Sequence, residues 1–357
     1  MFLTNTYSFL EEYDVKVSLL LFLKLSGGDV MSRETNQSAI RSTLSLENIK
    51  IPQKREYPTY ISYDREFDCA RIVFTQQPEP YTVGFGLFTP PGMGKTLYAY
   101  NLAAKFGAYL VKVDCNSQMR EDHLLGAYRT GLNENGDVET VWEDGPLPLA
   151  VRLANTGKKV VVLMNEFNLL RPDIQPLLNP LLDFQKSITL TSYGNETVKL
   201  TRGCIIFVLT GNPNIIGVNP IPQNVWSRMI VLLKMDIGDV IRTKKNVLTE
   251  IYQTVLRIPK KNAQILTLLN EKLVIAYENN DAITNPPTPR VLINLFRHIR
   301  PIANANLLTM KEKREHIEYI IQTVLINYVA KDRDEAEYVL KVLEGMDMFE
   351  KLRIAAA

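Results

Sequence analysis

Runs of consecutive apolar residues alternate with longer amphipathic stretches through the middle of the chain. Two stretches, KTLYAYNLAAKFG and GPLPLAVRLANTG, have the length and spacing of helices. The apolar runs between such stretches have the length of strands: VGFGLF, AYLVKV, KVVVLM, CIIFVL and MIVLLKM. Because strands covered on both faces are apolar throughout, the pattern predicts a central parallel sheet with helices on each side.

The pattern changes after Asp236, where strand-like runs stop and helical periodicity continues to the C-terminus. We therefore expect three parts: an N-terminal extension over residues 1–80, an α/β core over residues 81–236, and an α-helical lid with C-terminal helices over residues 237–357. Met31 opens a polar stretch and is a possible alternative start, which sets residues 1–30 apart from the rest of the extension.

Two hairpins are predicted within the core. Asn135-Gly136 separates two β-type runs, and this dipeptide is a strong signal for a two-residue turn. A second turn over residues 193–196 (YGNE) separates two alternating runs rich in threonine. From the pattern alone, each hairpin could also be a surface decoration without a role.

Composition and charge exclude several classes of protein. A hydrophobic content of 46% and a charged content of 22% are ordinary for a soluble globular chain. Lys and Arg number 41 against 39 Asp and Glu, so the net charge of +2 gives no electrostatic case for nucleic acid or an acidic membrane. The run VSLLLFLKL (residues 17–25) is far shorter than the ~20 residues of a membrane span. Three scattered cysteines without a CxxC pair suit a cytoplasmic protein with reduced thiols.

The segment FTPPGMGKT (residues 88–96) has the context of a phosphate-binding loop, because it follows a predicted strand and opens a predicted helix. Glycines let backbone N–H groups approach the phosphates, and the helix N-terminus adds to the anion cradle. Lys95 can reach the β- and γ-phosphates, and the Thr96 hydroxyl can bind Mg²⁺. The predicted contacts to ATP run from the loop into the helix: Pro91, Gly92, Met93, Gly94, Lys95, Thr96 and Leu97. The segment matches the pattern G-x-x-x-x-G-K-[ST] except at the first position, where Thr89 replaces Gly. The alternative to a phosphate-binding loop is a GKT sequence that occurs by chance at the start of a helix.

The stretch VVVLMNEFN (residues 160–168) ends a buried strand in the polar pair Asn165-Glu166, where most ATP-hydrolysing P-loop proteins carry two acids. Polar residues at this end of a strand face the crevice in which α/β sheets bind ligands. Glu166 is therefore the candidate general base for the attacking water. Asn165 takes the place of the acid that binds Mg²⁺, and its amide oxygen brings no negative charge. We expect weakened Mg²⁺ binding, low ATPase activity and a gain of activity on Asn165→Asp; an ordinary acid at a strand end is the alternative for Glu166.

Three further polar residues complete the predicted site. Asn212 follows the strand CIIFVL and could hold the lytic water between Glu166 and the γ-phosphate. Arg228 precedes the last strand, where it could act on a neighbouring subunit's γ-phosphate, or could instead pair with a local acid. Arg290 follows Pro289 at the start of a lid helix and faces the crevice between core and lid. There it could bind ATP and couple the γ-phosphate to the position of the lid, or else it is a solvated residue of the first turn.

These segments together resemble AAA+ ATPases over about residues 81–300, and in particular the MoxR-like branch with its CbbQ/NorQ, gas-vesicle GvpN, dynein-type and McrB-type relatives. TPPGMGKT is similar to Walker A, VVVLMNEFN to Walker B and LTGNPN to sensor 1. VWSRM stands at the position of the arginine finger, and TPRVL resembles the start of sensor 2. HLLGAYRTG with VETVWEDGPLPLAVR is similar to a long stretch of CbbQ-type proteins. Asn165 and Thr89 depart from the family pattern.

The resemblance implies a three-layer P-loop NTPase core, a helical lid and a homo-oligomeric ring of six subunits with ATP between neighbours. It implies that the two hairpins are inserts directed to the ring surface or pore, which would give Trp142 and Tyr193 a role beyond decoration. It also implies a protein client, or a partner carrying a von Willebrand factor A domain.

Competing functions remain open from the sequence. The first is an ATPase, with activity reduced by Asn165, that remodels or activates a partner protein. The second is an assembly module that ATP switches by binding, with little or no hydrolysis, because a ligand that prefers the assembled state stabilises it. A nucleic-acid motor would need a basic surface that the charge balance does not supply, and a salt-dependent gel shift would test it.

Overall fold

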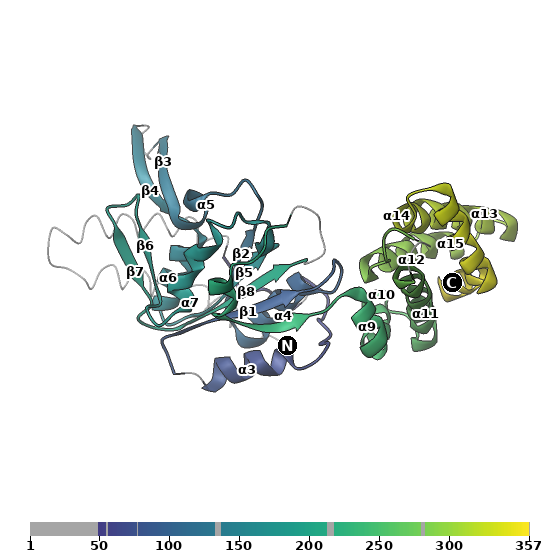
Figure 1. Ribbon diagram of the computed structural model, residues 1–357, viewed down its shortest axis with the longest axis horizontal. Coiled ribbons are helices and arrows are strands. Elements are labelled where there is room, and N and C mark those ends of the chain that lie inside the picture. The colour runs from purple at the N-terminus through teal and green to yellow at the C-terminus, as the bar shows by residue number, and fades with distance from the viewer. Residues whose placement is uncertain are drawn as a thin grey trace, which may run out of the picture.

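The computed structural model describes residues 49–54, 56–76, 78–132, 137–212, 218–279 and 283–356. The described residues contain a five-stranded parallel sheet in the order β2-β5-β8-β1-β9 (Figure 1). Its strands coincide with the five apolar runs: β1 (Tyr81–Phe88), β2 (Tyr109–Asp114), β5 (Lys159–Asn165), β8 (Cys204–Gly211) and β9 (Met229–Lys234).

Helices cover both faces of this sheet. Helix α4 (Lys95–Phe106), with α3 (Glu66–Gln76) beside it, packs on one face, and α6 (Pro146–Asn155) packs on the other. Successive side chains of a strand point to opposite faces. On β5, Val161 accordingly belongs to the buried cluster that includes α4, while Val162 belongs to the cluster that includes α6. The predicted fold class, a three-layer P-loop core around a parallel sheet, is confirmed.

A helical domain follows the core and lies beside it (Figure 1). Its first helix begins after Asp236, whose side chain accepts a hydrogen bond from the Asp239 backbone N–H as an N-cap. The helical part predicted after the sheet is confirmed by its helices: α9 (Ile237–Thr243), α10 (Lys245–Leu256), α11 (Lys260–Glu278), α12 (Pro289–Ala303), α13 (Met310–Ile320), the π-helical η3 (Ile321–Ile326), α14 (Asn327–Val329), α15 (Arg333–Gly345) and α16 (Met348–Ala356).

Short elements connect the strands within the core. They lie on the α6 side or at the ends of the sheet: α5 (Glu121–Leu125), η1 (Phe167–Leu169), η2 (Gln175–Leu178), α7 (Asn179–Leu182) and α8 (Gln223–Trp226). η1 begins directly after Glu166. The chain therefore turns sharply at the end of β5, next to the predicted catalytic residue.

The two predicted hairpins are present. β3 (Gly126–Leu132) pairs with β4 (Val138–Asp144), and β6 (Ser187–Leu190) pairs with β7 (Glu196–Lys199), both antiparallel. The Asn135-Gly136 turn lies outside the described residues. In the second hairpin, the two central residues of the turn both have positive φ, and the Glu196 N–H donates to the Tyr193 carbonyl, as in a type I′ turn.

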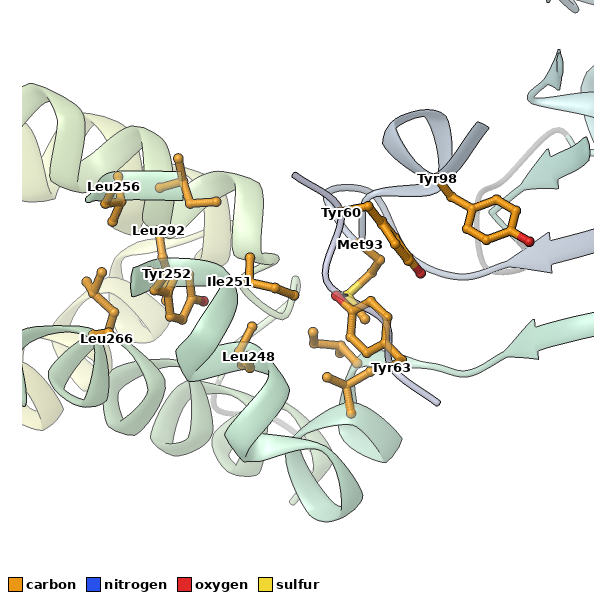
Figure 2. Packing of buried hydrophobic residues seen from close by; sticks show 14 of the residues in the cluster. Tyr60, Tyr63, Met93, Tyr98, Leu248, Ile251, Tyr252, Leu256, Leu266 and Leu292 are labelled. Atoms are coloured by element: carbon orange, nitrogen blue, oxygen red, sulfur yellow. Dashed lines mark hydrogen bonds between the residues drawn. The ribbon is translucent and has the colours of Figure 1, made fainter. Parts of the chain in front are cut away.

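Core and lid share one buried apolar cluster. Figure 2 shows Tyr63, from the segment before α3, and Met93 of the phosphate loop facing helix α10, which carries Leu248 and Ile251. The Tyr63 hydroxyl donates to the Met93 sulfur at 3.6 Å, so the phosphate loop itself is part of this contact. Movement of the lid would therefore displace residues of the phosphate loop.

Two features of the N-terminal extension, the apolar run over residues 17–25 and the alternative start at Met31, lie outside the described residues. Within the described part of the chain, no helix is long and apolar enough to cross a membrane.

Candidate functional site

The predicted phosphate loop joins β1 to α4 at the carboxyl edge of the sheet. Gly92 has φ +85°, a conformation that side chains rarely adopt, and a Cβ there would lie 2.7 Å from the backbone nitrogen of Arg290. The start of lid helix α12 thus lies directly against the loop. Thr89, at the departing first position, is buried, and its backbone N–H donates to the Gly211 carbonyl. This bond ties the loop to β8.

Lys95 is buried within the loop that it follows. Its ammonium donates to the carbonyls of Thr89 at 2.6 Å and Pro90 at 3.1 Å. Burial lowers the pKa of Lys95 to about 8; the nearby Glu166 carboxylate raises it, and the Arg290 guanidinium lowers it. A strand-end acid and a lid arginine thus both act electrostatically on this loop lysine.

Asn165 is the hub of a hydrogen-bond network at the end of β5. Its Oδ1 accepts from the hydroxyls of Thr96 and Thr210, each at 3.2 Å. Its Nδ2 donates to Oδ1 of Asp114 at 2.9 Å. The structure therefore brings Asn165 and Thr96 together, as predicted for a metal site, and adds an acid from a neighbouring strand.

Glu166 has φ 55° and ψ 45°, the left-handed conformation that is uncommon for a residue with a side chain. Its backbone N–H donates to Thr210 Oγ1 at 3.1 Å, and its carbonyl accepts from the Leu169 N–H. Strained conformations of this kind persist where surrounding bonds enforce them, and they are concentrated at functional sites. The half-buried carboxylate is thus held at the sheet edge by backbone geometry.

The other predicted site residues are placed as follows. Asn212 follows β8 directly and is buried, and its carbonyl accepts from the Asn168 amide at 2.9 Å. Arg228 pairs with Asp183 in its own chain, with Nη2 at 3.0 Å from Oδ2. Of the two interpretations offered for Arg228, the local pairing is the one visible in the single chain. Arg290 is the second residue of α12 and is exposed, and it makes no ion pair among the described residues.

The aromatic residues of the two hairpins pack against each other. The Trp142 and Tyr193 rings are stacked with centroids 4.9 Å apart, and Trp142 is 6% exposed. The Trp142 indole N–H donates to Asp144 Oδ1 at 2.8 Å. The Trp142 ring therefore joins the two hairpins to one another. The direction of the hairpins toward a ring surface or pore, which the resemblance implied, stays a prediction. Tyr128 packs on both rings and is the exposed aromatic of this group.

Sequence reasoning missed three groups at this site. Thr210 bridges Asn165 and the Glu166 backbone from β8. A segment before α3 lies against the loop, because a Cβ at Gly94 would stand 3.2 Å from the Tyr60 ring and the Tyr63 hydroxyl donates to the Met93 sulfur. The buried Glu66 carboxylate holds this segment, because it accepts from the Tyr60 hydroxyl and the Tyr63 N–H, each at 2.7 Å. Asp114 ends β2. The sequence held one signal for it, since AYLVKVD is an apolar run that ends in an acid, as VVVLMNE does.

The electrostatics of Asp114 follow from its contacts. Partial burial raises its pKa, but hydrogen bonds from Lys112 and Asn165 bring the net pKa below the ordinary value. Its Oδ2 lies 2.5 Å from the Lys112 ammonium, and both side chains are exposed. Such a solvent-screened pair is weak.

The oxygen atoms at the end of β5 fit Mg²⁺. The ion takes oxygen ligands in an octahedron, in which adjacent ligands lie about 2.9 Å apart. Thr96 Oγ1 and Asn165 Oδ1, at 3.2 Å, are close to that spacing. Among the residues that the structure describes, no group of three or more His, Cys, Asp or Glu side chains could hold a metal ion.

Comparisons with known proteins agree with this geometry. Residues 87–229, less than half of the chain, match the family model of the AAA domain (dynein-related subfamily). With the sheet and the phosphate loop, this match supports an AAA+ ATPase.

Two kinds of relative are similar to the chain. An uncharacterised protein of Staphylococcus aureus strain NCTC 8325 is 27% identical over 229 residues, which cover 63% of this chain and 82% of the relative. A solved variant of RuvB from Thermotoga maritima has a TM-score of 0.45 and 11% identity, covering 81% of this chain and 79% of its own. At that level the structural likeness carries no argument about function.

Proposed function

We propose that this chain is a MoxR-like AAA+ ATPase that hydrolyses ATP at subunit interfaces of a six-membered ring and thereby remodels or activates a partner protein. The observation that carries the proposal is the meeting of four groups at one sheet edge: the Lys95 ammonium, the Thr96–Asn165 oxygen pair, the Glu166 carboxylate and the lid at Arg290.

Each group has a role that its position supports. Lys95 exchanges its bonds to the loop carbonyls for charge-assisted bonds to phosphate oxygens. Glu166 orients water and accepts its proton, and Asn212, at the end of the next strand, holds that water. Mg²⁺ would be held by Thr96 and Asn165, and it neutralises charge that develops on the phosphates.

Arg228 completes the site from a neighbouring subunit in this proposal. It must first leave Asp183, but both side chains of that pair are about one-third exposed, so the pair is solvent-screened and inexpensive to break. The pairing with Asp183 then acts as a resting position for the guanidinium.

The partner class follows from the MoxR-like resemblance and is part of the proposal. A client protein, or a partner with a von Willebrand factor A domain, would bind the ring and respond to lid movement. Tyr128, the exposed aromatic at the hairpin cluster, is the residue with which we expect such a protein to make contact.

Steady-state phosphate release tests the proposal, measured across Mg²⁺ concentrations for the wild type and for Glu166→Gln. Turnover that the substitution removes supports a hydrolysing ATPase. Background release from both proteins, with ATP still bound and oligomers still formed, supports the second candidate, an ATP-switched assembly module. The neutral Asn165 at the metal position is the observation that favours this second candidate.

A further inference from the structure

The end of β5 carries an amide where a magnesium site ordinarily has an acid, and the adjacent strand carries an acid at the same level. β2 and β5 pair in parallel with Asp114 opposite Asn165. The Asn165 amide nitrogen donates to Asp114 Oδ1 at 2.9 Å. Asn165 itself carries no charge, but it is hydrogen-bonded directly to the Asp114 carboxylate.

The orientation of this amide is determined by its neighbours. A carboxylate can only accept hydrogen bonds when ionised, so the NH₂ group of Asn165 must face Asp114. The amide oxygen then faces Thr96 and Thr210, whose hydroxyls donate to it. Thr210 is consistent with this assignment, because its oxygen also accepts the Glu166 N–H. Asn165 therefore links Thr96, the predicted metal ligand, to an ionised acid.

The Asp114 carboxylate is free to serve an ion in this position. Within the described part of the chain, its second oxygen pairs with Lys112 alone, across an exposed contact that solvent screens. Mg²⁺ keeps several of its waters when it binds beside phosphates, and carboxylates commonly bind those waters rather than the ion itself. Asp114, which lies behind the Asn165 amide, suits contact with the ion through a metal-bound water.

We propose that Asp114 supplies the negative charge of the magnesium site. The acid then lies on β2 and the amide on β5, and the site keeps the net charge that an acid on β5 would give it. The proposal rests on the proposed function, because it assigns a residue to the Mg²⁺–ATP site. Asp114 acts through water bound to the ion and through the Asn165 amide, which makes it a positioning residue of the site.

The test is binding of a fluorescent, non-hydrolysable ATP analogue (mant-AMPPNP) as Mg²⁺ is raised from an EDTA baseline. We expect Asp114→Asn to raise the half-saturating Mg²⁺ concentration roughly 10- to 100-fold, the range for groups that support a metal ligand. The double variant Asp114→Asn/Asn165→Asp, which returns the acid to β5, should come back to within about threefold of the wild type.

Asp173→Asn is the matched control, because Asp173 is also an exposed acid paired with a basic neighbour, Arg171, and it takes no part in the hydrogen bonds of Asn165. It should leave the Mg²⁺ dependence unchanged. A shift in Asp114→Asn no larger than in this control, or equal weakening in EDTA and in Mg²⁺, would overturn the role of Asp114 alone. Failure of the wild type to bind the analogue at any Mg²⁺ concentration would overturn the proposed function and this inference with it.

Discussion

Replacing Gly92 by alanine tests whether the lid helix truly lies on the phosphate loop. A Cβ at this position would stand 2.7 Å from the backbone nitrogen and 2.8 Å from the Cβ of Arg290, closer than such atoms pack. Gly92 also has φ +85°, where a side chain costs roughly 1–2 kcal/mol. Displacing the packed start of α12 should cost about 1–3 kcal/mol more. We therefore expect Gly92→Ala to lose roughly 2–5 kcal/mol in the free energy of unfolding.

Gly107→Ala separates the two contributions. Gly107 follows α4 with φ +62°, but a Cβ there would meet nothing within 4 Å. This variant should lose only the backbone contribution of about 1–2 kcal/mol and bind nucleotide normally. Urea unfolding followed by the two tryptophans gives the stabilities, and mant-AMPPNP binding gives the affinities. Equal losses in both variants, with equal affinities, would refute the contact between lid and loop.

Three further predictions follow from single contacts. Asn165→Asp places a carboxylate against Asp114, so it should lower the melting temperature in EDTA, and Mg²⁺ should restore it. At high Mg²⁺ this variant should release phosphate faster than the wild type. The pKa of Lys95 is lowered to about 8 from 10.5, so the unfolded chain binds more protons than the folded chain between those pH values. The free energy of unfolding should therefore rise with pH across that window. ATP affinity should fall over the same window, because Lys95 loses its charge. Urea unfolding and ATP binding, each compared with Lys95→Met, check this, since the variant should lack both trends. Asp183→Asn should free the Arg228 side chain from its ion pair and raise the rate of phosphate release at low protein concentration. Arg228→Ala should abolish phosphate release and retain ATP binding. Equal rates in Asp183→Asn and the wild type would contradict the resting role of the Arg228–Asp183 pair.

The sheet was predictable because each central strand is buried on both faces. The five runs were recognisable as unbroken apolar segments, and side chains of β5 divide between two apolar layers as the period of a strand requires. The phosphate loop was predictable because its chemistry depends on consecutive residues between a strand and a helix.

Features that depend on distant pairings were not predictable. Asp114 and Asn165 are 51 positions apart in sequence and meet only through the register of β2 on β5. Trp142 is buried by stacking on Tyr193, which belongs to another hairpin, so this packing could not be predicted from the sequence around it. The partner of Arg228, Asp183, follows helix α7 and lies 45 positions earlier in the sequence, so the pair forms only through the fold.

The most direct test of the central claim is phosphate release by the purified wild type beside Glu166→Gln, at saturating Mg²⁺ and ATP. The account predicts slow release by the wild type and none above background in the variant, with nucleotide bound by both. Equal release from the two proteins would contradict Glu166 as the base, and background release from both would leave a chain that binds ATP without hydrolysing it.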